Sequence, residues 1–136
     1  MARGMVHIPW YATFFRGDRF EEALKEIAPV ARRYGATDYA VYRSRDDRYK
    51  FLHTVSFDSK LDWERYWNGP EFIDWREEHS SWYQVPVLYV WNDVVTEATG
   101  LKPHDRDAET KDPNVTDPTD ATMMSTENEP VGSRDD

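Results

Sequence analysis

The period of the apolar residues changes several times along this chain, and these changes restrict its fold more than any other feature. Two-residue alternation, the period of a β-strand, occurs in four segments: 5–15, 38–44, 49–57 and 85–95. Helical spacing occurs in two segments between them: 18–34 and 59–82. The order β-α-β-β-α-β predicts a ferredoxin-like α+β domain with an antiparallel sheet.

The ends of the first helical segment carry local signals. Asp18, with Glu21 three residues later, predicts a capping box at the start of the helix. Pro29 predicts a kink inside the helix because proline lacks the N–H that a helix interior needs. Gly35 predicts a left-handed residue just after the helix ends.

The second helical segment is dense in aromatic residues. Ser59 is expected to cap it, the sequence NGP at 68–70 interrupts it, and Pro70 restarts it at a favoured first position. Four of the six tryptophans fall between positions 63 and 82, around the stretch ERYWNGPEFIDWREEHSSWY. One helical stripe is predicted after the break: Phe72, Trp75, His79 and Trp82.

Both faces of the predicted sheet are apolar. In the last strand, Val87, Tyr89 and Trp91 alternate with Leu88 and Val90, so neither face is polar. A sheet that carries helices on one side needs only one apolar face. We therefore expect a homodimer in which two copies of the sheet pack face to face.

The charge of the chain is concentrated at its C-terminal end. Residues 100–136 hold ten acidic and four basic side chains and no aromatic residue, which predicts a disordered acidic tail. The expected domain is then 5–99, with a flexible N-terminus at 1–4. Of the chain's net charge of −9, residues 1–99 carry only −3, so the domain has no basic field for nucleic acid.

Several classes of site are excluded by residue type. The chain has no cysteine, which removes disulfides, thiolate metal sites and thiol nucleophiles. The three histidines before residue 100 lack paired metal-ligand spacing, so no metal site is expected. No apolar run approaches the roughly 20 residues of a membrane span. The start, MARGMVHIPW, lacks the apolar core of a secretion signal, and a cytoplasmic protein is expected.

The element order, the split helix YWNGPEFIDWREEHSSWY and the strand VPVLYVW resemble the dimeric α/β-barrel superfamily, which includes antibiotic-biosynthesis-monooxygenase-like proteins. The resemblance covers about residues 5–97. It implies dimerisation through the sheets and a pocket on each subunit between the sheet and the helices. Members include cofactor-free quinone-forming monooxygenases, haem-degrading enzymes, isomerases, polyketide cyclases and proteins of no known activity, so the fold alone does not give the function.

Two functions from different classes are compatible with this pattern. The first is a cofactor-independent monooxygenase-like, isomerase-like or cyclase-like enzyme acting on an aromatic or polyketide-like molecule. Its candidate proton-handling residues are His79, His7 and Tyr11. Its candidate substrate-binding residues are Trp10, His53, Trp67, Phe72, Trp75 and Tyr83. The second is a non-catalytic dimeric module that binds a hydrophobic ligand or haem, or has a purely structural role.

Each candidate residue also has a structural interpretation. The tryptophans can simply form the core, since large aromatic side chains dominate burial in small domains. His79 can donate to a carbonyl near a helix C-terminus, or it can be an axial ligand of an iron porphyrin. No asparagine occurs in 5–15, where the haem-degrading branch has one, so that branch's residues are not carried over and no cofactor is expected to be required.

Overall fold

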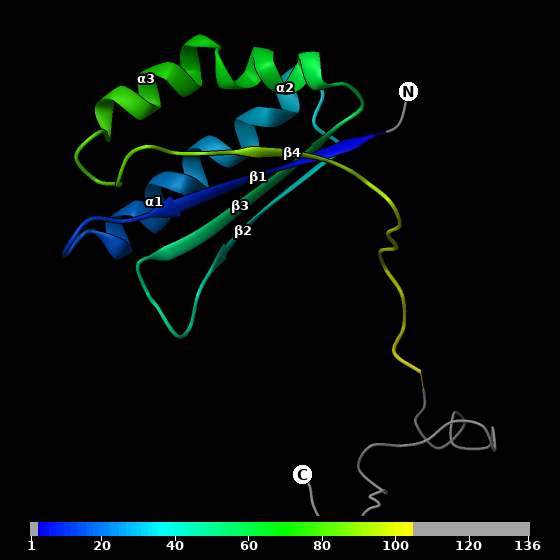
Figure 1. Ribbon diagram of the computed structural model, residues 1–136, viewed down its shortest axis with the longest axis horizontal. Coiled ribbons are helices and arrows are strands. Elements are labelled where there is room, and N and C mark those ends of the chain that lie inside the picture. The colour runs from blue at the N-terminus through cyan, green and yellow to red at the C-terminus, as the bar shows by residue number, and fades with distance from the viewer. Residues whose placement is uncertain (1–2, 105–136) are drawn as a thin grey trace, which may run out of the picture. The chain divides into compact units, whose positions relative to one another are not determined.

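The computed structural model describes residues 3–104 and contains one four-stranded antiparallel sheet. The strands are β1 (Gly4–Tyr11), β2 (Asp38–Arg43), β3 (Lys50–Phe57) and β4 (Val90–Asp93), in the spatial order β2-β3-β1-β4. The helices are α1 (Gly17–Ile27), the 3₁₀ helix η1 (Ala28–Tyr34), α2 (Lys60–Trp67) and α3 (Pro70–Glu78). The helices pack on one face of the sheet (Figure 1). The predicted α+β, ferredoxin-like class is confirmed.

The first helical segment divides where proline was expected to disturb it. α1 ends at Ile27, and the chain continues as the tighter η1 through Pro29. Gly35 follows in the left-handed region, with φ of 96°, as expected for a helix C-terminus. The predicted capping box is wrong. The N-cap is Arg16, without a side-chain hydrogen bond, and the Asp18 carboxylate instead accepts from Arg43 at 2.8 Å.

The second helical segment is split as predicted. The Ser59 hydroxyl accepts from the backbone N–H of Asp62 at 3.3 Å and so caps α2. Gly69 is the N-cap of α3, and Pro70 is its first residue. α3 ends at Glu78, so the expected stripe is shorter than predicted: His79 is the C-cap, and Trp82 lies beyond the helix.

Two predicted strands are too long. β1 ends at Tyr11 rather than at residue 15, and Phe14 and Phe15 are exposed. β4 covers only Val90–Asp93, because residues 85–89 form no strand ladder with β1. The alternation of side chains nevertheless persists through this stretch. Val87, Tyr89 and Trp91 pack against the core, whereas Leu88 and Val90 are exposed.

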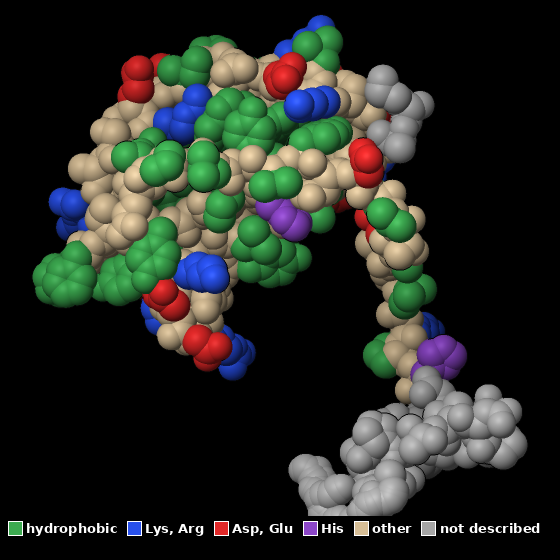
Figure 2. All heavy atoms as spheres, in the orientation of Figure 1, with side chains coloured by type: hydrophobic (Ala, Val, Ile, Leu, Met, Phe, Trp, Pro, Cys, Tyr) green, Lys and Arg blue, Asp and Glu red, His purple; other side chains and the backbone are tan. Residues whose placement is uncertain are grey.

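The face of the sheet that the helices leave uncovered is partly apolar. Directly paired residues share a face, so Tyr42 and Leu52 lie together, and Pro9 lies opposite Leu52 on the next strand. Tyr42 is 59% exposed and Leu52 37% exposed. Hydrophobic side chains gather along β4 and on the surface below it (Figure 2). We call this uncovered face the open face.

The sheet and helices belong to a compact unit that runs to Glu97, and Ala98 begins a second unit. The predicted disorder of the tail falls mainly on residues 105–136, outside the described residues, and the prediction for 1–4 falls partly on residues 1–2, which are also outside. Within residues 3–104, no helix is both long enough and apolar enough to cross a membrane.

Candidate functional site

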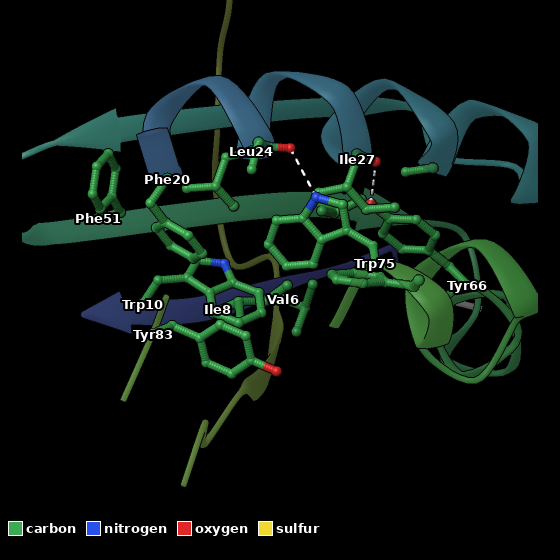
Figure 3. Close-up of a cluster of buried hydrophobic side chains, with 14 of the residues drawn as sticks. Val6, Ile8, Trp10, Phe20, Leu24, Ile27, Phe51, Tyr66, Trp75 and Tyr83 are labelled. Carbon is green, nitrogen blue, oxygen red and sulfur yellow. Dashed lines mark hydrogen bonds between the residues drawn. The ribbon is translucent and has the colours of Figure 1, made fainter. Parts of the chain in front are cut away.

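The six predicted substrate-binding residues lie together between the sheet and the helices. Trp10 of β1 is their centre: its ring centroid is 5.4 Å from that of Trp75, 5.1 Å from Tyr83, 6.3 Å from Phe72 and 6.4 Å from Trp67. Figure 3 shows Trp10, Trp75 and Tyr83 within the buried cluster. We call these six residues the aromatic interior: Trp10, His53, Trp67, Phe72, Trp75 and Tyr83.

The polar atoms of three aromatic residues in and beside this interior are satisfied by backbone carbonyls. The Trp75 indole N–H donates to the Ala23 carbonyl at 2.9 Å, and the Tyr66 hydroxyl donates to the Ile27 carbonyl at 2.6 Å (Figure 3). The Tyr83 hydroxyl donates to the Arg76 carbonyl at 3.1 Å. Burial raises the pKa of both tyrosine hydroxyls, so both stay protonated donors.

His53 is the polar group enclosed by this interior. Its side chain is completely buried, and burial lowers its pKa to about 3, so the imidazole is neutral near pH 7. The Trp10 indole N–H lies 3.3 Å from Nδ1 of His53. Because an indole N–H can only donate, Nδ1 is the acceptor and Nε2 carries the proton. Nε2 has no hydrogen-bond partner among the described residues.

Trp67 closes the aromatic interior at the break between α2 and α3. Its half-buried ring lies 4.9 Å from Phe72 and 5.3 Å from Tyr89. The Arg76 guanidinium lies 3.8 Å from the centroid of the Trp67 ring, and its Nη1 donates to the Trp67 carbonyl at 2.8 Å. Hydrophobic and basic side chains occur together between β4 and these two helices (Figure 2). Trp67 is thus the member of the interior that also meets the surface.

Residues 16–78 match the family model described as "Antibiotic biosynthesis monooxygenase". Residues 16–78 are thus similar to this family, and we call the sheet-and-helix unit that contains them the ABM-like domain. A search of curated proteins finds no match to the chain.

Several solved structures share the fold of this chain. Rv0793 from Mycobacterium tuberculosis is 15% identical, with a TM-score of 0.63, over 72% of this chain and 100% of that one. PA3566 from Pseudomonas aeruginosa is also 15% identical, with a TM-score of 0.63, over 71% and 97%. A mutant of SnoaB, a cofactor-independent oxygenase from Streptomyces nogalater, is 11% identical, with a TM-score of 0.63, over 73% and 99%. At these identities the likeness is one of fold.

His79, a predicted catalytic residue, lies outside the aromatic interior of the ABM-like domain. Its Nδ1 is 2.7 Å from the Trp75 carbonyl, so this nitrogen donates to the end of α3, the structural role that the sequence allowed. The ring borders a depression of about 300 Å³, which is lined by Arg19, Glu22, Ala23, Glu26, His79 and Trp82.

A haem does not fit the histidines of the ABM-like domain. Glu22 and Glu26 line the depression beside His79 and would repel the carboxylates of a porphyrin. Arg19 is the one basic residue that lines the same depression. His53 is completely buried, and its Nδ1 already accepts from the Trp10 indole. Within residues 3–104, no group of three or more potential metal ligands comes together.

His7 and Tyr11, the other predicted catalytic residues, occupy the opposite face of β1 from Trp10. The Tyr11 hydroxyl donates to the Asp47 carboxylate at 2.5 Å rather than to His7. This hydrogen bond raises the pKa of Tyr11 and lowers that of Asp47. Both candidates therefore lie on the open face, and their catalytic roles stay predictions that depend on what covers that face.

Sequence reasoning did not single out two residues that border the aromatic interior. Trp63 is completely buried, its ring lies 5.3 Å from Trp67, and its indole N–H has no partner among the described residues. The Arg76 guanidinium stacks on the Trp67 ring. The signal for Trp63 was present, because it lies four residues before Trp67 on one helical face. The contact of Arg76 crosses the helix break and has no such local signal.

Proposed function

We propose that this protein is a cofactor-independent monooxygenase-like enzyme that acts on an aromatic or polyketide-like small molecule bound in the aromatic interior. The observation that carries the proposal is a neutral, completely buried His53 with a free N–H, whose ring lies next to Trp10 and Phe72. The ABM match and the fold shared with SnoaB, a cofactor-independent oxygenase, support this class of reaction.

The residues of the interior suit a substrate that supplies its own electrons to oxygen. Tryptophan and phenylalanine rings pack against a flat apolar molecule. The substrate loses its phenolic proton to water before it binds, and the N–H of His53 can donate to the resulting phenolate oxygen in a site shielded from water. A ring CH₂ activated in this way reacts with O₂ to give a carbonyl and water. One oxygen atom enters the carbonyl, and the other leaves with both hydrogens, so no external reductant is needed.

We propose that substrate enters where Trp67 meets the surface. Five of the six residues of the interior are buried, so binding requires a side chain to move. Trp67 is half-buried at a helix break, whereas Trp10 and Phe72 are held within the packed core. A split helix provides fewer backbone constraints at the break than a continuous helix does, and this favours Trp67 as the residue that moves.

We also propose that two copies pair through their open faces. The exposed apolar side chains of Tyr42 and Leu52 support this proposal. Pairing would cover His7 and Tyr11 and place them in a shared interface.

The second candidate is a non-catalytic module that binds a hydrophobic ligand. It is favoured because Nδ1 of His53, the nitrogen that could act as a base in the interior, already accepts a hydrogen bond from Trp10. Oxygen uptake distinguishes the two functions. The full chain would be incubated with 1,8-dihydroxyanthrone, and anthraquinone formation would be followed by absorbance alongside O₂ consumption.

We expect one O₂ per quinone formed, with a rate that metal chelators leave unchanged. His53→Phe should lower the enzymatic rate roughly 100-fold, because removing one oxyanion donor typically costs that much. Trp91→Phe, at the β4 edge of the core, is the matched control for a change of aromatic side chain. No quinone formation above the uncatalysed rate would contradict the oxygenase proposal.

A further inference from the structure

Two adjacent phenylalanines in the loop between β1 and α1 are left outside the core. Phe14 is 72% exposed and Phe15 83% exposed, and their ring centroids lie 4.1 Å apart. Figure 1 shows this loop projecting beyond the end of β1, and hydrophobic side chains form a protrusion at the same place in Figure 2. We call this pair the aromatic tip. Because the pair follows the last residue of β1, it belongs to neither face of the sheet.

The backbone of the aromatic tip is strained. Phe15 has a φ of 67°, in the left-handed region, which a bulky side chain rarely adopts. Its exposed ring gains little packing within the chain in return. Strain of this kind persists where surrounding contacts enforce it, and it concentrates in segments that bind or switch. The strain and the exposure are explained together if the aromatic tip binds a partner.

The loop is held in one conformation, so the two rings are presented in a fixed position. The Thr13 N–H donates to the Trp82 carbonyl at 2.9 Å. The Phe15 N–H donates to the Tyr49 hydroxyl at 3.4 Å, and the Phe14 ring is stacked on that of Tyr49 with 6.3 Å between centroids. A preformed loop loses little conformational freedom when its rings are buried against a partner.

The surroundings of the aromatic tip are basic, although the domain as a whole is acidic. The loop and the β2–β3 hairpin beside it, residues 12–18 and 43–50, hold five basic and three acidic residues, for a net charge of +2. Residues 1–99 carry −3, so the rest of them carry −5. Arg45 and Arg48 form no ion pair within the part of the chain that the structure describes. This charge distribution orients the domain with the aromatic tip towards a negatively charged surface.

The size of the aromatic tip distinguishes two kinds of partner. Two phenylalanine side chains bury about 300–500 Å². A specific protein interface buries about 800 Å² on each partner, which is more than this pair provides. A small apolar tip among basic residues suits an anionic lipid bilayer instead. Aromatic rings enter the boundary between the headgroups and the acyl chains there, and basic side chains meet the phosphates.

We propose that the aromatic tip inserts into an anionic lipid surface and so docks the domain there. Three exposed basic side chains meet the headgroup phosphates: Arg45, Arg48 and Lys50. The attachment is to the surface of the bilayer and needs no spanning segment. It goes beyond the proposed reaction, because no residue of the aromatic interior takes part.

The test is co-sedimentation of the full chain with vesicles of phosphatidylcholine alone or with about 30% phosphatidylglycerol. We expect an affinity at least about tenfold higher for the anionic vesicles, and this affinity should fall as salt is added. Phe14→Ala should lower it about tenfold, because one buried ring is lost. Arg45→Gln and Arg48→Gln should each lower it about fivefold. Leu61→Ala, which shortens an exposed side chain of α2, is the matched control and should leave it unchanged.

Phe15→Asn separates lipid binding from folding. Asparagine tolerates the left-handed region better than phenylalanine does, so this variant should be at least as stable as the natural chain in urea. Its affinity for the anionic vesicles should nevertheless fall about tenfold, because one ring is lost. A lower stability with an unchanged affinity would show that the Phe15 ring serves the fold, and would overturn the inference.

Three further results would each overturn the inference: no binding to the anionic vesicles, equal binding to both kinds of vesicle, or unchanged binding by folded Phe14→Ala. So would assemblies larger than a dimer that form without lipid and that Phe14→Ala disperses, because the aromatic tip would then be a contact between copies of the chain. None of these measurements uses a substrate, so their outcome is independent of the proposed reaction.

Discussion

The Trp10 indole N–H donates to Nδ1 of His53 at 3.3 Å, joining the adjacent strands β1 and β3 inside the core. The hydrogen bond fixes the tautomer of His53 and leaves its other nitrogen as a donor. It also requires the neutral tautomer with its proton on Nε2, because a proton on Nδ1 would oppose the indole N–H. A single buried pair thus sets both what the interior can bind and how the fold responds to acid.

The first prediction concerns pH. Burial lowers the pKa of His53 to about 3, whereas an unfolded histidine titrates near 6.5, so the unfolded chain binds more protons between these values. The contribution of His53 to stability is complete above pH 6.5 and is lost as the pH falls towards 3, at up to about 1.4 kcal/mol per pH unit. Urea unfolding at a series of pH values between 7 and 4 would measure this slope.

His53→Phe is the control for that slope. The variant loses the titrating group but keeps Asp47 and Glu71, two carboxyls whose hydrogen bonds lower their pKa values and which also weaken the fold in acid. The variant should be less stable at pH 7, because the Trp10 N–H is left unpaired, yet its stability should fall less steeply with acid. If the free energy of unfolding fell equally steeply with acid in the variant and in the natural protein, this result would contradict the low pKa of His53.

The second prediction concerns the helix break. A Cβ atom at Gly69 would lie 2.5 Å from the Tyr34 hydroxyl and 2.7 Å from the Arg65 carbonyl. Tyr34 cannot simply retreat, since its hydroxyl donates to Glu71 at 2.5 Å. Gly69→Ala should lower the free energy of unfolding by about 1–3 kcal/mol, as overpacking does in other cores. Chemical denaturation of the variant would measure this loss.

A double variant separates the two contacts. Adding Tyr34→Ala to Gly69→Ala should recover only part of the loss, since the Arg65 carbonyl belongs to the backbone and cannot move away as a side chain can. Complete recovery would show that Tyr34 is the only obstacle, and an unaffected Gly69→Ala would contradict the crowding at the break.

The elements of this fold were predictable because their signals are short-range. The alternation in β3 and the helical spacing from Phe20 to Ala31 are decided by neighbours a few residues away, and the structure buries those positions. The capping box failed for the opposite reason. Arg43, 25 residues after Asp18 in sequence, offers a charged hydrogen bond that no local pattern around α1 can reveal.

The site was predictable in its composition but not in its geometry. Large aromatic residues on sheet-facing positions of β1 and α3 had to meet, so Trp10, Phe72 and Trp75 were identified together. The position of His79 was harder to predict, because its helix ends one residue earlier and the ring turns back to a carbonyl. The free N–H of Trp63 depends on which acceptors surround it in three dimensions, which sequence spacing does not specify.

The third prediction concerns the ion pairs that replaced the capping box. Arg43 is largely buried and donates to Asp18 at 2.8 Å, to Glu21 at 3.0 Å and to the Arg48 carbonyl at 2.6 Å. A lysine cannot make this forked set of bonds, so Arg43→Lys should cost about 1–3 kcal/mol of unfolding free energy. Thermal and urea unfolding would both register this loss.

The two carboxylates should not contribute equally. The Asp18 side chain is 97% exposed and that of Glu21 is 34% exposed. Water screens the exposed pair more strongly, so Asp18→Asn should cost less than about 0.5 kcal/mol, and Glu21→Gln should cost more. The reverse order would show that exposure does not control the strength of these ion pairs.

The last prediction concerns assembly through the open face. Leu52 lies on β3, one of the two central strands, opposite Pro9 and Tyr42, and is 37% exposed in the single chain. If two sheets pack there, Leu52→Asp places a charge in an apolar interface without a partner, which is strongly unfavourable. Light scattering at micromolar concentration should then give twice the mass of one chain for the natural protein and a single-chain mass for the variant.

Leu61→Asp is the matched control, because Leu61 is a 54% exposed leucine on α2, away from the open face, and should leave the dimer intact. A single-chain mass for the natural protein would contradict the pairing, as would dissociation by Leu61→Asp but not by Leu52→Asp.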